Sequence, residues 1–356
     1  MDAPTRVVVW ATGWTGTLAI RAIHRRPDLD LVGVWVHSPE KVGRDAGELA
    51  GIGPIGLEAT HDADALLGLA PDCVAYTASG PERDAVAVAV PDYVTMLERG
   101  INVVTVSSPG LVFPAGFDAR VRDRLADAAA RGGASLYASG IEPGFAGDQL
   151  VLTLATMSES ITSIRTQELF CYDRYPVTFM MFDVFGFGKP LDYTPLMSYE
   201  GAQLTTWGPP VRMVAHALGA PLDGIRETYE RRATDRTLEV ASGVIEAGTC
   251  GAIRMETIGI VGGRDAIVIE HVNRMAPDLA PDWPTAERDG TYRILIEGNP
   301  GLQCDMTVGT GETAQVEGMV ATTSRIVNAI PHVVDAPPGL VGSLDLPLTL
   351  PRHALI

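Results

Sequence analysis

One short stretch near the start constrains the fold more than any other part of the chain. Residues 7–16 read VVVWATGWTG, an apolar run followed by a tight loop of small residues, and the next residues, TLAI, begin a helical pattern. A dinucleotide site needs this order of strand, loop and helix, because the pyrophosphate approaches the backbone and sits at the positive helix N-terminus. The loop has the GxGxxG spacing with alanine in the first glycine position. The alternative is a merely structural tight turn. The spacing predicts a cofactor loop formed by Ala11, Thr12, Gly13, Trp14, Thr15 and Gly16.

The pattern continues to about residue 145 as an alternation of short, valine-rich runs with helical stretches. Strands of this kind are buried on both faces, as in a parallel sheet covered by helices. We therefore predict a dinucleotide-binding domain over residues 1–145, the first half of an α/β protein. The expected strands cover residues 6–10, 31–36, 73–76, 102–105 and 135–139, and the expected helices start near Thr15, Asp62, Pro91 and Phe117.

From about Thr162 the pattern changes to long alternating segments joined by glycine turns, with few helical stretches between them. Two pairs of segments predict hairpins: residues 252–261 with 266–275, and residues 292–297 with 302–308. We predict a second α+β domain over residues 146–312, built on a largely antiparallel sheet that binds the substrate. A last helix at about residues 313–330 and the proline-rich tail are expected to pack back on the first domain.

Length and charge narrow the class of protein. A chain of 356 residues is long for one hydrophobic core, which favours two domains. Its net charge of −17 argues against binding to nucleic acid or to anionic lipid. There is no long signal-like apolar segment and no stretch of the roughly 20 apolar residues that span a bilayer, so we expect a cytoplasmic protein. The four cysteines are far apart, and no motif for a metal, ATP or acyl-enzyme chemistry occurs.

The end of the second strand bears on the choice of cofactor. NAD enzymes usually carry an acidic residue there for the ribose hydroxyls, whereas this chain reads VHSPEK at residues 36–41. His37, Ser38 and Lys41, with Arg44 nearby, can hold a 2′-phosphate, so NADP(H) is preferred and NAD(H) remains possible. The alternative is that Lys41 and Arg44 are solvated loop charges.

Small hydroxyl residues follow two later strands at their carboxyl ends, where ligands bind in open parallel sheets. Thr77, Ala78 and Ser79 follow one strand, and Ser107 and Ser108 follow the next. We expect the first four at the cofactor and Ser108 at the substrate, although ordinary turn residues would give the same pattern.

The segment over residues 172–199 is aromatic, glycine-rich and without clear period, which is typical of a pocket wall or lid. With the residues just before it, this segment predicts an apolar substrate pocket, the alternative being core packing. Few cationic side chains accompany the pocket, which favours a neutral, apolar substrate. The predicted lining is Phe145, Glu168, Phe170, Tyr172, Tyr175 and Phe182.

Several motifs together resemble a known family. They are ATGWTG at residues 11–16, VHSPEKVG at 36–43, GIEPGF at 140–145, VNAIP at 327–331 and APPGL at 336–340. In this order they resemble the 2,4-diaminopentanoate dehydrogenases and the related native amine dehydrogenases, within a group similar to dihydrodipicolinate reductase. The resemblance implies an N-terminal Rossmann domain, a second domain that mediates homodimerisation, and a cofactor contact at Asn328. It also implies NAD(P)-linked oxidative deamination of an amine, reversible as reductive amination.

The chain departs from this family at one functional position. Members carry a catalytic glutamate in the loop after the fourth strand, where this chain reads TVSSPGL at residues 105–111. The asparagine before the family's Pro-Gly-Phe is replaced here by Glu142. We infer that Glu142 supplies the missing carboxylate from the next strand end, held extended by Pro143. The alternative is that Glu142 is an N-terminal charge for a helix near Gly147.

The sequence therefore predicts an NAD(P)H-dependent amine dehydrogenase that joins a small, mostly apolar ketone or aldehyde to ammonia through an iminium. A positioned carboxylate would assist proton transfer in that chemistry. Two alternatives stay open. One is an imine or carbonyl reductase that needs no ammonia, and the other is a regulator that binds NADPH without catalysis.

Overall fold

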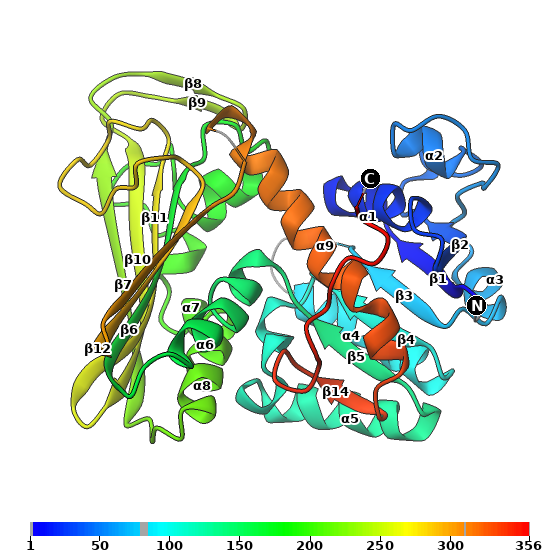
Figure 1. Ribbon diagram of the computed structural model, residues 1–356. Coiled ribbons are helices and arrows are strands. Elements are labelled where there is room, and N and C mark those ends of the chain that lie inside the picture. Colours follow the sequence, from blue (N-terminus) through cyan, green and yellow to red (C-terminus); the bar gives the residue numbers. More distant parts are fainter. Residues whose placement is uncertain (1–2, 79–84, 310, 356) are drawn as a thin grey trace. The chain divides into compact units, whose positions relative to one another are not determined.

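The structure is a computed structural model that describes residues 3–78, 85–309 and 311–355 (Figure 1). The chain divides into two compact units, the first formed by Met1–Ile141 with Met319–Ile356 and the second by Glu142–Gly318. The sequence placed these divisions after residues 145 and 312. Glu142 therefore opens the second unit instead of closing the first.

The first unit contains a six-stranded parallel sheet in the order β14-β5-β4-β3-β1-β2. The predicted Rossmann fold is confirmed, and the tail adds a strand to this sheet beside β5. From β1 the chain passes to β2 on one side and then to β3 on the other, so the order reverses at β1, where open sheets bind ligands. The strands are β1 (Thr5–Trp10), β2 (Leu29–Trp35), β3 (Cys73–Tyr76), β4 (Asn102–Thr105), β5 (Ser135–Ala138) and β14 (Gly339–Val341).

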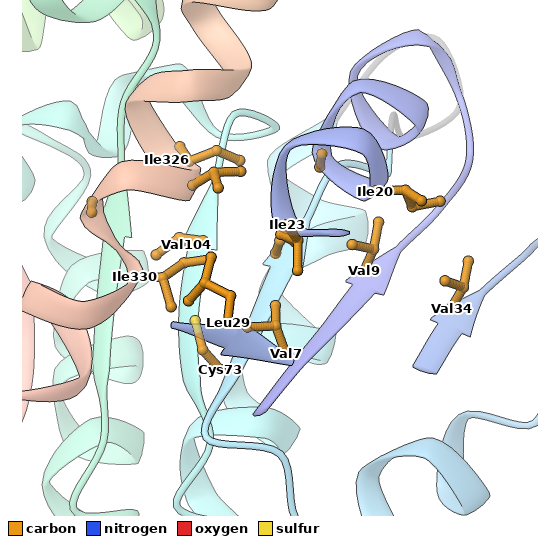
Figure 2. Close-up of a cluster of buried hydrophobic side chains, with 14 of the residues drawn as sticks. Val7, Val9, Ile20, Ile23, Leu29, Val34, Cys73, Val104, Ile326 and Ile330 are labelled. Carbon is orange, nitrogen blue, oxygen red and sulfur yellow. The ribbon is translucent and has the colours of Figure 1, made fainter. Parts of the chain in front are cut away.

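Helices cover both faces of this sheet. Successive strand residues point to opposite faces, and apolar side chains on both faces pack against helices. Val7 and Val9 pack with Ile20 of α1 and Ile330 of α9 (Figure 2), whereas Val8 packs with residues of α3, α4 and α5. The helices are α1 (Trp14–His24), α2 (Ala46–Leu49), α3 (Ala63–Gly68), α4 (Ala85–Glu98), α5 (Ala119–Gly132) and α9 (Ala314–Val334), with short 3₁₀ turns η1 (Pro39–Lys41), η2 (Pro109–Val112) and η3 (Pro114–Gly116).

One predicted helix start was wrong. The helix expected to begin near Pro91 is α4, and Pro91 lies inside it. Proline is favoured in the first turn of a helix, so an internal proline is a misleading start signal. The predicted start near Asp62 is supported by the structure, since the Asp62 side chain caps α3 by accepting from the Ala65 amide.

The second unit is built on a mixed six-stranded sheet in the order β13-β12-β6-β11-β10-β7. Neighbouring strands are antiparallel except β6 and β11, which run parallel. Both predicted hairpins form, β10 with β11 and β12 with β13. The strands are β6 (Ser160–Cys171), β7 (Gly224–Ala233), β10 (Cys250–Val261), β11 (Arg264–Arg274), β12 (Thr291–Asn299) and β13 (Leu302–Thr307), and β8 (Leu238–Val240) with β9 (Gly243–Ile245) forms a separate hairpin.

The few helices of this unit are short, and α8 covers one face of the sheet. Val211 and Val214 of α8 pack against Ile253 and Met255 of the sheet and close its core. Two prolines stand in the first turn of α8, where no helical amide is lost. The helices are α6 (Gln149–Ala155), α7 (Ala202–Thr206) and α8 (Gly208–Ala217), with short turns η4 (Ile141–Phe145), η5 (Met180–Val184), η6 (Leu196–Ser198) and η7 (Gly311–Thr313). Within the described chain, no helix combines the length and apolar character needed to cross a membrane.

Candidate active site

The loop between β1 and α1 has the tight geometry of a phosphate-binding turn. Ala11 adopts a positive φ of 87°, a conformation that favours glycine. A Cβ on Gly16 would stand 2.0 Å from the carbonyl oxygen of Ala11. The hydroxyl of Thr77 donates to the carbonyl oxygens of Trp10 and Ala11, at 3.0 and 3.3 Å. Glycine is therefore required at position 16, as expected of the third glycine of the motif.

The electrostatics of this loop suit an anion. Gly13 caps α1 without a side-chain hydrogen bond, and no acidic residue stands in the first turn. The ammonium of Lys41 donates to the carbonyl oxygen of Thr12 at 3.1 Å and lies 3.3 Å from its hydroxyl. Helix N-terminal amides and a nearby ammonium both attract phosphate. The residues present therefore fit the diphosphate of a dinucleotide.

The other predicted cofactor residues occupy varied places in the first unit. Trp14 and Thr15 begin α1, His37 is exposed beside Trp35, and Ser38 precedes η1. Ala78 follows β3, but Ser79 lies outside the described residues.

Three further predicted residues form hydrogen bonds with other residues of the first unit. The Ser107 amide donates to the Thr105 hydroxyl at 2.9 Å, and the buried Ser108 hydroxyl pairs with Tyr93 at 3.0 Å. The side-chain oxygen of Asn328 accepts from Arg26 at 3.2 Å. These contacts give Ser108 and Asn328 a structural role, and a contact with a ligand stays a prediction for both.

In the second unit, Glu142 is the residue with the most unusual surroundings. Its backbone is extended, with φ −155° and ψ 116°, as predicted for a residue before proline. Both carboxylate oxygens are buried and have no hydrogen-bond partner. Space for them depends on Gly147, because a Cβ there would lie 2.7 Å from one of them. A buried carboxylate without partners is costly unless a ligand completes it.

Charge reinforces this effect. Burial, followed by the negative charges of Glu168 and Asp148, raises the pKa of Glu142 well above its ordinary value. Asp148 is itself buried and accepts a hydrogen bond from the Gln149 amide at the start of α6. Asp148 is therefore the carboxylate that caps this helix.

Glu168 supplies a second buried carboxylate, from the middle of β6. One of its oxygens accepts from the Tyr172 hydroxyl at 2.6 Å and from the Asn273 amide nitrogen at 3.1 Å. In the sheet register Glu168 stands opposite Tyr292 on β12 and His271 on β11. Side chains that share a register row on adjacent strands lie on the same face of the sheet. Glu168, Asn273 and Tyr292 therefore project from one face.

Aromatic rings surround these acids. Burial, followed by the charge of Glu168, raises the pKa values of Tyr172, Tyr175 and Tyr292, and Glu142 adds to the effect on Tyr292. The ring of Phe170 lies 5.1 Å from that of Tyr292, and Tyr172 lies 5.6 Å from Tyr175. The predicted residues Glu168, Phe170, Tyr172 and Tyr175 are therefore brought together.

Two other predicted pocket residues are less closely tied to these acids. The ring of Phe182 packs against the backbone at Gly188 and Gly243. These contacts lie in the aromatic segment and in the β8–β9 hairpin. Phe145 is half-buried at the end of η4.

Sequence reasoning missed Asn273, Tyr292 and Asp148. Asn273 is fully buried in β11, but Glu270 and His271 of the same strand are also buried and polar, so its sequence offered no distinguishing signal. Tyr292 was assigned only to a hairpin.

Arg174 pairs with Glu312 at 3.3 Å, and burial lowers the pKa of His271, which packs against Trp207. Arg174 is therefore paired with an exposed acid, whereas His271 stands opposite Glu168, whose charge partly offsets the lowering of the His271 pKa.

The chemistry available to this cluster is that of proton exchange and cation binding. It combines the carboxyl groups of Glu142 and Glu168 with a tyrosine hydroxyl and the side-chain amide of Asn273. Among the described residues, no group of three histidine, cysteine or acidic side chains is arranged to hold a metal ion.

A cavity of about 320 Å³ lies elsewhere in the second unit. Its lining includes Ser160, Ile164 and Arg264, at the start of β6 and β11. Glu168 lies four residues beyond Ile164, which is about 13 Å along the strand. The acidic residue that lines this cavity, Glu159, is exposed, so the buried acids are the better candidate for chemistry.

The parallel sheet and its cofactor loop define the class as a nicotinamide-dependent oxidoreductase of the Rossmann type. The dihydrodipicolinate reductase N-terminus family matches residues 5–90. The 2,4-diaminopentanoate dehydrogenase C-terminal domain family matches residues 145–355. The chain belongs to the 2,4-diaminopentanoate dehydrogenase family, as its motifs indicated.

Known relatives agree with this assignment. An amine dehydrogenase from Streptomyces virginiae is 42% identical over 346 residues, covering 96% of each chain. A 2,4-diaminopentanoate dehydrogenase from Acetoanaerobium sticklandii is 24% identical over 259 residues, covering 71% of this chain and 68% of its own. The structure of an amine dehydrogenase from Mycobacterium smegmatis shares the fold, with a TM-score of 0.80 at 21% identity over 98% of both chains. The chain is an oxidoreductase of the family whose named members act on CH–NH2 groups.

Proposed function

We propose that this protein is an NAD(P)H-dependent amine dehydrogenase that catalyses the reductive amination of a small carbonyl compound with ammonia, and the reverse deamination. One observation carries the proposal: Glu142 is a buried carboxyl group whose two oxygens have no partner. The family's catalytic glutamate is absent from the loop after β4, and Glu142 is the carboxyl group that replaces it. The 42% identity to a named amine dehydrogenase supports the same reaction class.

The chemistry requires a group that both accepts and returns a proton. Ammonium must lose a proton before its nitrogen can attack a carbonyl carbon, and the carbinolamine oxygen must gain one before it leaves as water. A carboxyl group with a raised pKa is suited to both steps near neutral pH. We assign both proton transfers to Glu142. Its burial excludes water, which strengthens its interaction with a cationic iminium.

The cofactor is proposed to be NADP(H), with NAD(H) as a weaker alternative. Residues 11–16 would hold the diphosphate, and Lys41, with His37 and Ser38, would hold the 2′-phosphate. When bound, the nicotinamide supplies the hydride in one direction and accepts it in the other. The ammonium of Lys41 already lies on the loop, at Thr12, and no acidic residue caps this end of α1.

We propose a carbonyl substrate that is small and mostly apolar, in keeping with Phe170, Tyr172, Tyr175 and Phe182. The functional form is proposed to be a homodimer, as in the family, joined through the second unit.

The reaction class is tested by NADPH and NADH oxidation with a panel of small ketones and aldehydes, with and without ammonium at matched ionic strength. Turnover that depends on ammonium, and that places ¹⁵N from labelled ammonium in the product by mass spectrometry, supports the proposal. Equal turnover without ammonium would instead identify a carbonyl or imine reductase. Tight NADPH binding without turnover on any substrate would identify a regulator.

A further inference from the structure

The second carboxylate of the site, Glu168, has no counterpart in the single-glutamate chemistry proposed above. It is 5% exposed, in the central part of a β-strand, where an acidic side chain is rare without a partner of opposite charge. It accepts hydrogen bonds from the hydroxyls of Tyr172 and Tyr292 and from the amide of Asn273, all neutral donors, and burial lowers the pKa of the neighbouring His271. A buried negative charge held only by neutral groups is a seat for a positive ligand.

The neighbouring amide fixes which atoms remain available. Because Asn273 donates its Nδ2 to Glu168, its Oδ1 is directed elsewhere, and that oxygen is buried with no partner. The opposite amide orientation would place two oxygens against each other, so the contact with Glu168 determines the assignment. Asn273 is itself fully buried. Its unpaired oxygen is therefore a buried acceptor on a side chain that contacts Glu168.

The site therefore has a surplus of acceptors. Both oxygens of Glu142 and Oδ1 of Asn273 are buried and unpaired, and a buried acceptor left without a donor destabilises the folded protein. The charged and titratable groups that face this cluster are Glu142, Glu168, Asp148 and the surrounding tyrosines, with a buried His271 whose pKa is lowered by burial. The missing element is a compact cation with several N–H donors.

We propose that Glu168 and Asn273 form the binding seat for ammonia in its ammonium form, while Glu142 exchanges protons with it. This inference rests on the proposed function and adds a second residue with a separate task. Glu168 and Asn273 determine affinity for ammonium and for the amino group of the product, whereas Glu142 determines the rate of the proton steps.

The steps balance as follows. Ammonium bound at Glu168 and Asn273 gives one proton to the Glu142 carboxylate, and the resulting ammonia forms a C–N bond to the carbonyl carbon. A proton moves from nitrogen to oxygen to give a neutral carbinolamine. Glu142 then returns its proton to that hydroxyl, the C–O bond breaks, and water leaves an iminium. Hydride addition reduces the iminium carbon while the nicotinamide is oxidised, and the amine takes one proton from solvent.

Glu168→Gln is the sharpest variant for a test. Glutamine retains an oxygen that can accept from Tyr172 and Asn273, but it removes the charge and turns the second oxygen into a donor. We expect the KM for ammonium to rise at least tenfold, while the KM for the carbonyl compound changes less than threefold. Glu239→Gln, on the exposed strand β8, removes the same charge elsewhere and should leave both constants unchanged.

A second readout does not depend on turnover. A ligand that binds only the folded state raises the melting temperature. Ammonium chloride should therefore raise the Tm of the wild type more than sodium chloride at the same ionic strength, and this difference should vanish in Glu168→Gln. If Glu168→Gln does not fold, Asn273→Ala, which removes the seat oxygen, should weaken ammonium binding in the same two assays.

The outcomes separate the two proposals. If the wild type shows no ammonium-dependent turnover, the proposed function fails. If it does, but Glu168→Gln and Asn273→Ala keep the wild-type KM for ammonium and the ammonium-specific Tm shift, the reaction stands and the assigned seat is overturned.

Discussion

Gly16 offers a prediction whose size follows from a single distance. A Cβ at this position would lie 2.0 Å from the carbonyl oxygen of Ala11, whereas ordinary contacts begin at 3.4 Å, so Gly16→Ala requires a displacement of 3.4 minus 2.0, or 1.4 Å. The atom in the way belongs to the backbone and cannot rotate aside. Overpacking of this kind costs about 1–3 kcal/mol. At roughly 2–4 °C per kcal/mol, the Tm should fall by about 2–12 °C.

Gly13→Ala is the matched control in the same loop. A Cβ at Gly13 meets no atom within 4 Å, and its φ of −72° suits any residue. The Tm of the cofactor-free protein should therefore stay within about 1 °C of wild type. Binding of NADPH should nevertheless weaken at least tenfold, because the second glycine of such a loop lets the diphosphate approach the backbone.

Both variants are compared by thermal unfolding without cofactor and by NADPH titration monitored through tryptophan fluorescence. Gly16→Ala should lose stability and affinity together, and Gly13→Ala should lose affinity alone. Wild-type stability and NADPH affinity in Gly16→Ala would refute the close packing of α1 on Ala11. An equal loss of Tm in Gly13→Ala would refute the separation of structural and cofactor roles.

Three further predictions concern the acids and the cofactor. Gly147→Ala should keep the wild-type Tm but lower kcat at least tenfold, because its Cβ would stand 2.7 Å from a Glu142 oxygen and displace that side chain; wild-type kcat would contradict the placement of Glu142. Glu142→Gln should raise the Tm at pH 8 but not at pH 4. The pKa of Glu142 is raised in the folded protein, so wild-type stability falls as the pH rises from the ordinary value of 4.5 towards the folded value, and glutamine lacks this loss; a Tm gain of the same size at both pH values would count against it. Lys41→Ala should raise the KM for NADPH at least tenfold and leave that for NADH within threefold; equal changes for both would show that Lys41 does not contact the 2′-phosphate.

Much of the first unit was predictable because local signals and tertiary structure agree there. The strands over residues 73–76 and 102–105 match β3 and β4 in full. Their continuous apolar sequence is what a strand covered on both faces requires. The loop from Ala11 to Gly16 was predictable for the same reason, since its small residues allow the positive φ at Ala11 and the close approach of Gly16 to the backbone.

The second unit was less readable because its distinctive features depend on contacts between distant segments. The parallel pairing of β6 with β11 joins residues about 100 apart, such as Ile164 and Ile267, and no local pattern encodes strand direction. The predicted start near Pro91 failed because proline also occurs within a helix, here α4.

The candidate site shows the same division. Glu142 was predicted because a neighbouring proline and the absence of the loop glutamate indicated it, and Glu168 was predicted among the residues that line the pocket. Asn273 and Tyr292 could not be assigned, since their place beside Glu168 follows from the sheet register alone. Register is determined by the whole sheet and its core, not by any short segment.

The central claim, that Glu142 replaces the family's loop glutamate, is tested most directly by single-turnover reduction of a ketone in the presence of saturating ammonium and NADPH. Wild type and Glu142→Gln are compared, with Glu239→Gln as the control for loss of an exposed charge. We predict that Glu142→Gln still binds NADPH with wild-type affinity while its rate falls by about 10²- to 10⁴-fold, the usual contribution of a positioned acid and base. An ammonium-dependent rate within threefold of wild type in Glu142→Gln would contradict the account.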